Sequence, residues 1–259
     1  MTLAPSHFSQ AISIAMIVLN EEQNIGDCIK SCQNLGTLTI VDGGSEDNTV
    51  ERITSMGHRV IYRKWTNFCE QKQHAVDLCA TDWVLFLDAD ERLTPALISE
   101  IKNLSLDDQT VAYAIPRKTY FLGKEIHFCG WRPDYVTRLF NRTHVRFNDR
   151  PVHESVVGFS KTLKLTNPLL HFSYRNENDI TRKIMQYSEL GAQRLIKTRK
   201  SINAAEPFLR GAWVLVKTLI LKLGFLDLKS GLQIAMMNYT TTKLKYIKAK
   251  ELLSFDEGG

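Results

Sequence analysis

Blocks of apolar and polar residues alternate along the N-terminal third of the chain, and they predict a regular succession of strands and helices. Residues 11–19 (AISIAMIVL) are almost continuously apolar, which is typical of a strand covered on both faces in a parallel sheet. Further strands are expected at 38–41, 59–62 and 83–87, with helices between them at 24–35, 48–56 and 70–80. This alternation predicts half of a doubly wound α/β fold.

The pattern changes in the second half of the chain. A helix is expected at 95–104 and a strand at 111–116, followed by short strand-like pieces and loops up to His171. Beyond Asn178 the sequence is helical almost to its end, with interruptions near Pro207 and around Gly224 and Gly231.

These patterns predict two domains. An α/β domain is expected over residues 1–175, with one half at about 11–104 and another at about 105–175. A basic helical region is expected over residues 176–259.

The fourth expected strand ends in acids. Residues 83–91 read WVLFLDADE, and residues two apart on a strand face the same side, so Asp88 and Asp90 project together from its carboxyl end. Convergent carboxylates suit Mg²⁺ or Mn²⁺, with phosphates and water completing the shell. A nucleotide diphosphate is the implied partner. The alternative is a solvated loop before a helix that starts near Pro95, where acids are also favourable.

Charge is unevenly distributed along the chain. Residues 194–250 hold twelve Lys or Arg and two acids, a local balance of +10, whereas the whole chain carries +5. Residues 208–228 are apolar, but Arg210, Lys217, Lys222 and Asp227 interrupt them, so they do not predict a spanning helix. An interfacial helix on an anionic membrane surface is expected, and a helix that packs against the rest of the protein is the alternative.

The cysteines and the N-terminus indicate the compartment. The five cysteines have neither CxxC pairing nor the spacing of a secreted framework, and Cys28 and Cys32, one helical turn apart, are better explained by packing than by metal binding. The start MTLAPSHFSQ does not resemble a signal peptide. We expect a cytoplasmic protein, peripheral at the inner face of the cytoplasmic membrane.

Four motifs follow one another in the N-terminal half: VLNEE at Val18–Glu22, VDGGSEDNT at Val41–Thr49, a helix that contains Lys72, and DWVLFLDADE at Asp82–Glu91. In this order and spacing they resemble the nucleotide-sugar glycosyltransferases of family 2, over about residues 11–160. The resemblance implies a GT-A fold, which is Rossmann-like with a mostly parallel sheet, here followed by the C-terminal helical appendage.

Four further motifs resemble one branch of that family. They are GW-PD at Gly130–Asp134, RLF at Arg138–Phe140, PVHE at Pro151–Glu154, and FLD followed by SG and QIA between Phe225 and Ala235. They are similar to the group that adds a sugar to the inner core of bacterial lipopolysaccharide, the β-1,4-glucosyltransferases.

The resemblance implies roles for matching residues on the donor side. Glu21 and the backbone beside Leu19 contact the uridine, and Asp42 hydrogen-bonds the uracil or the ribose. Asp88 contacts the ribose or a water of the metal shell, and Asp90 binds the Mg²⁺ or Mn²⁺ that bridges the diphosphate.

Lys72 stands where similar proteins often carry Arg, since their Gln-Arg-Asn is Gln71-Lys72-Gln73 here. It keeps the charge for nucleotide-sugar binding but lacks the bidentate fork. Lys72 as a solvated helix residue and Asp42 as a turn former before Gly43-Gly44 are the competing interpretations.

On the acceptor side the resemblance implies that Trp131 stacks on a sugar and that Arg138 contacts the acceptor, although Trp131 could instead belong to the core. The base that takes the acceptor proton is expected in His153-Glu154. Glu154 is favoured as the base, with His153 orienting it or touching the phosphates. Reversed roles, or a structural salt bridge between Glu154 and Arg150, are the alternatives.

The implied function is inverting, metal-dependent transfer of a hexose from a UDP-sugar, and glucose is the expected hexose. The expected acceptor is a lipid-linked saccharide, namely a heptose of the lipopolysaccharide inner core. A polyprenyl phosphate or capsule precursor as acceptor stays open, as does a membrane-tethered nucleotide-sugar-binding protein without turnover. A glycosidase is disfavoured, because its two carboxyls would flank the scissile bond. Nucleic acid is not an expected partner, since the basic tail lacks interleaved aromatic residues.

Overall fold

The computed structural model describes residues 12–148, 155–199 and 201–256, and within them the chain forms two compact units. The first unit runs through Lys118 and resumes at Asp134–His171. The second consists of Thr119–Pro133 and the chain from Phe172 onward. Each unit buries hydrophobic clusters of its own.

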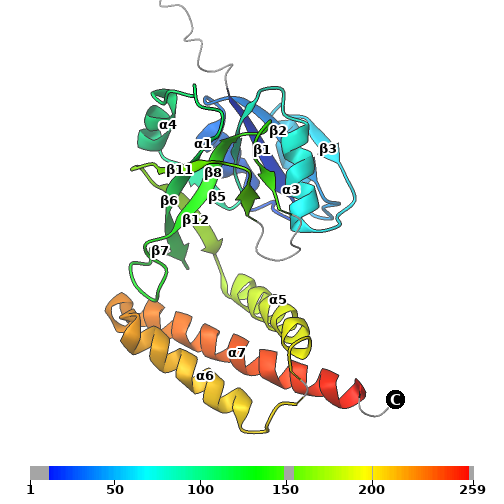
Figure 1. Ribbon diagram of the computed structural model, residues 1–259, viewed down its shortest axis with the longest axis vertical. Coiled ribbons are helices and arrows are strands. Elements are labelled where there is room, and N and C mark those ends of the chain that lie inside the picture. The colour runs from blue at the N-terminus through cyan, green and yellow to red at the C-terminus, as the bar shows by residue number, and fades with distance from the viewer. Residues whose placement is uncertain (1–11, 149–154, 200, 257–259) are drawn as a thin grey trace, which may run out of the picture. The chain divides into compact units, whose positions relative to one another are not determined.

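The first unit begins with the predicted alternation of strands and helices (Figure 1). The sheet order is β3-β2-β1-β4, and the pairs β1–β2, β2–β3 and β1–β4 are all parallel. This confirms the α/β class and the doubly wound half. The elements are β1 (Ile12–Val18), α1 (Ile25–Cys32), β2 (Thr37–Asp42), α2 (Thr49–Ser55), β3 (Val60–Tyr62), α3 (Phe68–Asp77) and β4 (Trp83–Phe86).

Beyond β4 the sheet becomes mixed. β8 lies antiparallel between β4 and β6, β12 is antiparallel to β5, and β11 is parallel to β6. The strand expected at 111–116 continues to Phe121. The elements are β5 (Glu91–Leu93), α4 (Pro95–Lys102), β6 (Val111–Phe121), β7 (Lys124–Glu125), β8 (Tyr135–Asn141), β9 (Arg146–Phe147), β10 (Val156–Val157), β11 (Lys161–Lys164) and β12 (Leu169–Tyr174).

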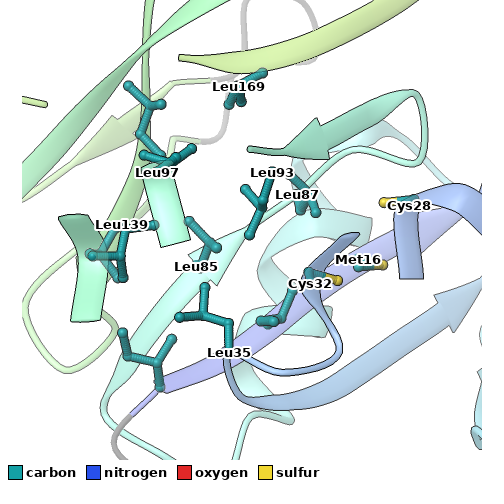
Figure 2. Close-up of a cluster of buried hydrophobic side chains, with 14 of the residues drawn as sticks. Met16, Cys28, Cys32, Leu35, Leu85, Leu87, Leu93, Leu97, Leu139 and Leu169 are labelled. Atoms are coloured by element: carbon teal, nitrogen blue, oxygen red, sulfur yellow. The ribbon is translucent and has the colours of Figure 1, made fainter. Parts of the chain in front are cut away.

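The core of the first unit lies between the sheet and its helices. All seven residues of β1 are buried, as its continuous apolar run predicts. Figure 2 shows Cys28 and Cys32 of α1 in this core beside Met16 and Leu87. All five cysteines are buried free thiols, so packing accounts for Cys28 and Cys32.

The second unit contains three long helices, with α5 and α6 packed along α7. The apolar run 208–228 is not one continuous helix, because it divides into α6, a π-helical turn and a 3₁₀ turn. None of the helices in the described parts of the chain is both long and apolar enough to cross a bilayer. The elements are α5 (Glu177–Ile196), α6 (Glu206–Val216), η2 (Lys217–Leu221), η3 (Gly224–Asp227) and α7 (Leu228–Asp256).

The expected interruption at Gly231 is absent, because Gly231 lies within α7. The interruption expected around Gly224 is present, since the chain turns at Leu223 and Leu228, which have φ values of +52° and +53°. A Cβ on Gly231 would lie 1.7 Å from the carbonyl oxygen of Gly224. Gly231 therefore permits a close approach between the turn and the helix rather than ending the helix.

Candidate functional site

Three neighbouring strands of the first unit end at one edge of the sheet. Because β2 and β4 flank β1 and run parallel to it, their carboxyl ends lie together. Leu19 and Glu21 follow β1, Asp42 ends β2, and Asp88 and Asp90 follow β4. This edge therefore gathers the residues that were expected on the donor side, where ligands bind in open α/β sheets.

Hydrogen bonds join the loop after β1 to the loop after β2. The backbone N–H of Asn20 donates to Ser45 Oγ at 2.9 Å, and that of Glu21 donates to Thr49 Oγ1 at 2.7 Å. The Glu21 carboxylate accepts from Asn24 Nδ2 at 2.7 Å. These bonds hold Leu19 and Glu21 in a fixed loop, and their contact with a uridine stays a prediction.

Asp42 is 3% exposed and organises the turn that follows it. Its carboxylate accepts from the N–H of Gly44 at 2.9 Å and from Ser45 Oγ at 2.5 Å. The turn-forming interpretation therefore describes what the Asp42 side chain does in this structure. A further bond to a nucleotide stays a prediction.

Asp88 is held between two cations. Lys72 Nζ on α3 lies 3.3 Å from Asp88 Oδ1, and Arg138 Nη2 on β8 contacts Asp88 Oδ2. Lys72 is not a solvated helix residue, because it is 5% exposed and its Nζ lies 5.0 Å from the centre of the Phe86 ring. Burial alone would raise the pKa of Asp88, but the charges of Arg138 and Lys72 hold this pKa well below its ordinary value.

Glu91, for which the sequence predicted no role, contacts the same nitrogen of Arg138 as Asp88 does. It is fully buried, and its Oε1 lies 2.6 Å from Arg138 Nη2 and 3.6 Å from Arg117 Nη1. Its Oε2 accepts from the backbone N–H of Asp88 at 3.1 Å. Although burial alone would lower the pKa of Arg138, the charges of Asp88 and Glu91 raise it. The observed partners of Arg138 are thus carboxylates, and its contact with an acceptor stays a prediction.

Asp90 lies beside a histidine that sequence spacing did not identify. His171 Nε2 on β12 is 3.3 Å from Asp90 Oδ2, and the two side chains are 15% and 21% exposed. The antiparallel pairing of β12 with β5 places His171 opposite Glu91, next to Asp90 along the chain. Only this long-range strand pairing brings the imidazole to the acidic motif.

The chemistry of these side chains fits a divalent cation held largely by its substrate. Among the described residues no group of three or more His, Cys, Asp or Glu is arranged to hold a metal. Asp90 and His171 offer one carboxylate and one imidazole, and Mg²⁺ or Mn²⁺ commonly takes its other ligands from phosphates and water. Asp88 is already bound by two cations, so Asp90 suits direct ligation better.

The remaining expected residues are Trp131, His153 and Glu154 of the acceptor side. Trp131 belongs to the second unit, where its ring stacks on Tyr174 at a centroid distance of 5.8 Å and meets Phe121 edge-on. It is partly buried against this hydrophobic cluster, and stacking on a sugar stays a prediction. His153 and Glu154 lie outside the described residues.

Comparison with known proteins identifies relatives of the chain. The model of the family described as "Glycosyl transferase family 2" matches residues 13–162. The lipopolysaccharide core biosynthesis glycosyltransferase LpsC of Rhizobium meliloti is 31% identical over 202 residues, which cover 73% of each protein. An uncharacterized glycosyltransferase of Rickettsia prowazekii is 28% identical over 82% of this chain and 77% of its own.

Two solved structures resemble this chain more weakly. Staphylococcus aureus TarS 1–349 in complex with UDP-GlcNAc has a TM-score of 0.48 and 12% identity, over 96% of this chain and 92% of TarS. Glucosyl-3-phosphoglycerate synthase from Mycobacterium tuberculosis, in complex with Mn²⁺ and UDP-glucose, has a TM-score of 0.33 and 23% identity, over 44% of each chain.

Proposed function

The chain belongs to glycosyltransferase family 2, and from this premise we propose that it transfers a hexose from a UDP-sugar to a saccharide of the lipopolysaccharide inner core, with inversion. Glucose is the expected hexose. The donor binds at the edge of the sheet where β1, β2 and β4 end. The observation that carries this proposal is the pair of ion contacts at the end of β4, Lys72–Asp88–Arg138 and Asp90–His171.

The two aspartates take different roles in this proposal. Asp88 stays ionised because Arg138 and Lys72 neutralise it, so it is an acceptor of fixed orientation for a ribose hydroxyl or a metal-bound water. Asp90 and His171 would hold a divalent cation, Mg²⁺ or Mn²⁺, by one oxygen and one nitrogen. When bound, such a cation neutralises negative charge on the leaving diphosphate.

Inversion requires an acceptor hydroxyl in line with the bond to the leaving group and a base that removes its proton. We assign the base to Glu154, with His153 as its positioning partner, from their place in the PVHE motif. The hydroxyl oxygen attacks the anomeric carbon, the bond to the diphosphate breaks, and the proton passes to the Glu154 carboxylate.

The acceptor assignment rests on sequence relatives. LpsC, at 31% identity, is named for lipopolysaccharide core biosynthesis. An acceptor of this kind is anchored in a membrane, so the enzyme meets it at the cytoplasmic leaflet. The basic helical region 176–259 supplies the attraction to anionic lipid, which places the protein peripherally on that surface.

The test is transfer from radiolabelled UDP-sugars to lipopolysaccharide truncated at the inner-core heptose. The wild type should transfer glucose in preference to other hexoses. Glu154→Gln should bind UDP-glucose normally but lose transfer by at least ~10²-fold. The matched control Glu251→Gln, an exposed change on α7, should leave transfer unchanged. Near-normal transfer by Glu154→Gln removes Glu154 as the base, and absence of transfer by the wild type to this acceptor contradicts the acceptor assignment.

A further inference from the structure

The second unit exposes an apolar surface along the hairpin formed by α6, the turns η2 and η3, and the first part of α7. On α6 and η2, Leu209, Trp213, Val216 and Ile220 recur at helical spacing and are 45–68% exposed. These four residues form one stripe. Their spacing is that of a buried helix face, yet they remain uncovered.

A second stripe continues on α7. Leu228, Leu232 and Met236, each one turn after the last, are 70%, 52% and 46% exposed. Between the stripes, three leucines and a phenylalanine of residues 221–226 are also exposed by 45–62%. We call the exposed apolar side chains of residues 208–236 the hairpin surface. Large exposed apolar side chains that recur along one hairpin in this number mark an interaction site.

The packing of the hairpin turns these stripes outward. Gly211 lets α6 approach α7 so closely that a Cβ there would lie 2.9 Å from the Tyr239 ring. On α7, Ile234 and Ala235 are buried between the exposed Leu232 and Met236, and Met237 is buried directly after them. The helices therefore use their opposite faces to form the unit, and the hairpin surface is left over after folding.

The exposed charges on the hairpin are positive, and one of them is paired within α6, where Arg210 Nη2 lies 3.2 Å from Glu206 Oε1. Arg210, Lys217, Lys222 and Lys229 are exposed within it. The only acid in residues 207–250 is Asp227, which is 8% exposed and accepts from the backbone N–H groups of the loop at residues 127 and 128. The hairpin surface is thus apolar with a positive rim and has no exposed carboxylate.

A lipid bilayer with anionic headgroups matches this combination. Apolar side chains and Trp213 suit the headgroup–acyl boundary, and long basic side chains reach the phosphates. A second copy of the chain fits less well, because a two-fold contact through the same surface would bring basic side chains of one copy against basic side chains of the other.

We propose that the hairpin surface inserts into the interface of an anionic bilayer and that Leu209 and Trp213 lie among its inserted residues. This specifies the membrane contact of the proposed function, but it stands on the second unit alone and does not require a donor site. The basic rim sets the preference for anionic lipid.

The test measures binding of the full chain to vesicles by flotation. It compares anionic vesicles of phosphatidylglycerol and phosphatidylcholine with neutral vesicles of phosphatidylcholine alone. The wild type should bind the anionic vesicles at least ~10-fold more tightly at low salt. Its tryptophan emission should shift to the blue on binding, and Trp213→Phe should lose that shift. The double variant Leu209→Glu, Trp213→Glu should lose at least ~10-fold in vesicle affinity.

The matched control is Leu163→Glu, Met185→Glu, which places the same two charges on exposed apolar positions outside the hairpin. It should bind vesicles like the wild type. Equal losses in both variants, or no loss in the hairpin variant, overturn the proposal. A third outcome also overturns it: the wild type does not bind anionic vesicles but sediments as a dimer, and the variant Leu209→Glu, Trp213→Glu sediments as a monomer. A second copy of the chain would then cover the surface.

Donor binding separates this proposal from the proposed function. Calorimetry with UDP should give the same affinity for the hairpin variant and the wild type, which also establishes that the variant is folded. Vesicle binding without UDP binding would leave the hairpin proposal standing and contradict the transferase.

Discussion

Lys72 Nζ and Asp88 Oδ1 lie 3.3 Å apart, joining helix α3 to the end of strand β4 through a buried ion pair. Lys72 is 5% exposed, so its ammonium group has little water around it and depends on Asp88 and on the face of Phe86. The pair therefore connects the stability of the first unit to the geometry of the candidate donor site.

Replacing Lys72 by Met should lower the free energy of unfolding by about 1–3 kcal/mol, as read from urea titration. This is less than the loss expected for a fully buried pair, because Asp88 retains Arg138 and its side chain is 28% exposed. The control Lys64→Met removes an exposed lysine and should change stability by less than about 0.5 kcal/mol. Equal effects of the two variants would show that the buried pair is not stabilising.

The depressed pKa of Asp88 predicts acid sensitivity. Because the pKa is lower in the folded state, the stabilisation is complete above the unfolded value of about 3.9 and is lost as the pH falls below it. Below pH 4 the slope from this one group approaches about 1.4 kcal/mol per pH unit. Urea unfolding of the wild type and of Asp88→Asn from pH 6 to 2.5 measures this pH dependence. If the free energy of unfolding falls with pH equally in both proteins, Asp88 does not cause the acid sensitivity.

His171→Ala should weaken Mn²⁺ binding in the presence of UDP by ~10-fold or more, since the imidazole would be a direct ligand. The electron paramagnetic resonance signal of free Mn²⁺ gives the affinity. His127→Ala, on a side chain that is 54% exposed, is the control and should behave as the wild type. An unchanged Mn²⁺ affinity in His171→Ala would leave His171 as a structural partner of Asp90.

Gly231→Ala should destabilise the second unit by ~3 kcal/mol, because its Cβ would lie 1.7 Å from the backbone oxygen of Gly224. Gly26→Ala is the matched control: it lies in α1, where the added carbon would have no atom within 4 Å apart from its chain neighbours and the helix's own backbone, and it should stabilise by about 0.5 kcal/mol. Thermal unfolding of both variants measures the difference. A tolerated Gly231→Ala would contradict the close approach of turn and helix.

The N-terminal half of the fold is readable from sequence because local pattern and tertiary environment agree there. The run at 11–19 predicts a strand buried on both faces, and β1 is such a strand. In the run at 208–228 the interruption around Gly224 could be predicted but its form could not, because the turn after Leu221 depends on positive φ angles and on the contact of Gly231 with Gly224. Neither leaves a signal in hydrophobic periodicity.

The sequence predicts the residues of the candidate site only where they lie at the end of a strand or directly after it. Asp88 and Asp90 could be placed from the strand that precedes them. His171 could not, since it reaches Asp90 through the pairing of β12 with β5. Glu91 could not be placed either, because the cation that neutralises it, Arg138, lies on β8 and meets it only in the folded sheet.

Calorimetric titration of UDP and UDP-sugars, with and without Mn²⁺, tests the central claim most directly when wild type and Asp90→Ala are compared. Asp27→Ala, an exposed change on α1, is the control. We predict Mn²⁺-dependent binding of UDP to the wild type and the control, tighter binding of UDP-glucose than of other UDP-sugars, and loss of binding in Asp90→Ala. Binding of UDP that is indifferent to both Mn²⁺ and Asp90, or no binding at all, would contradict the account.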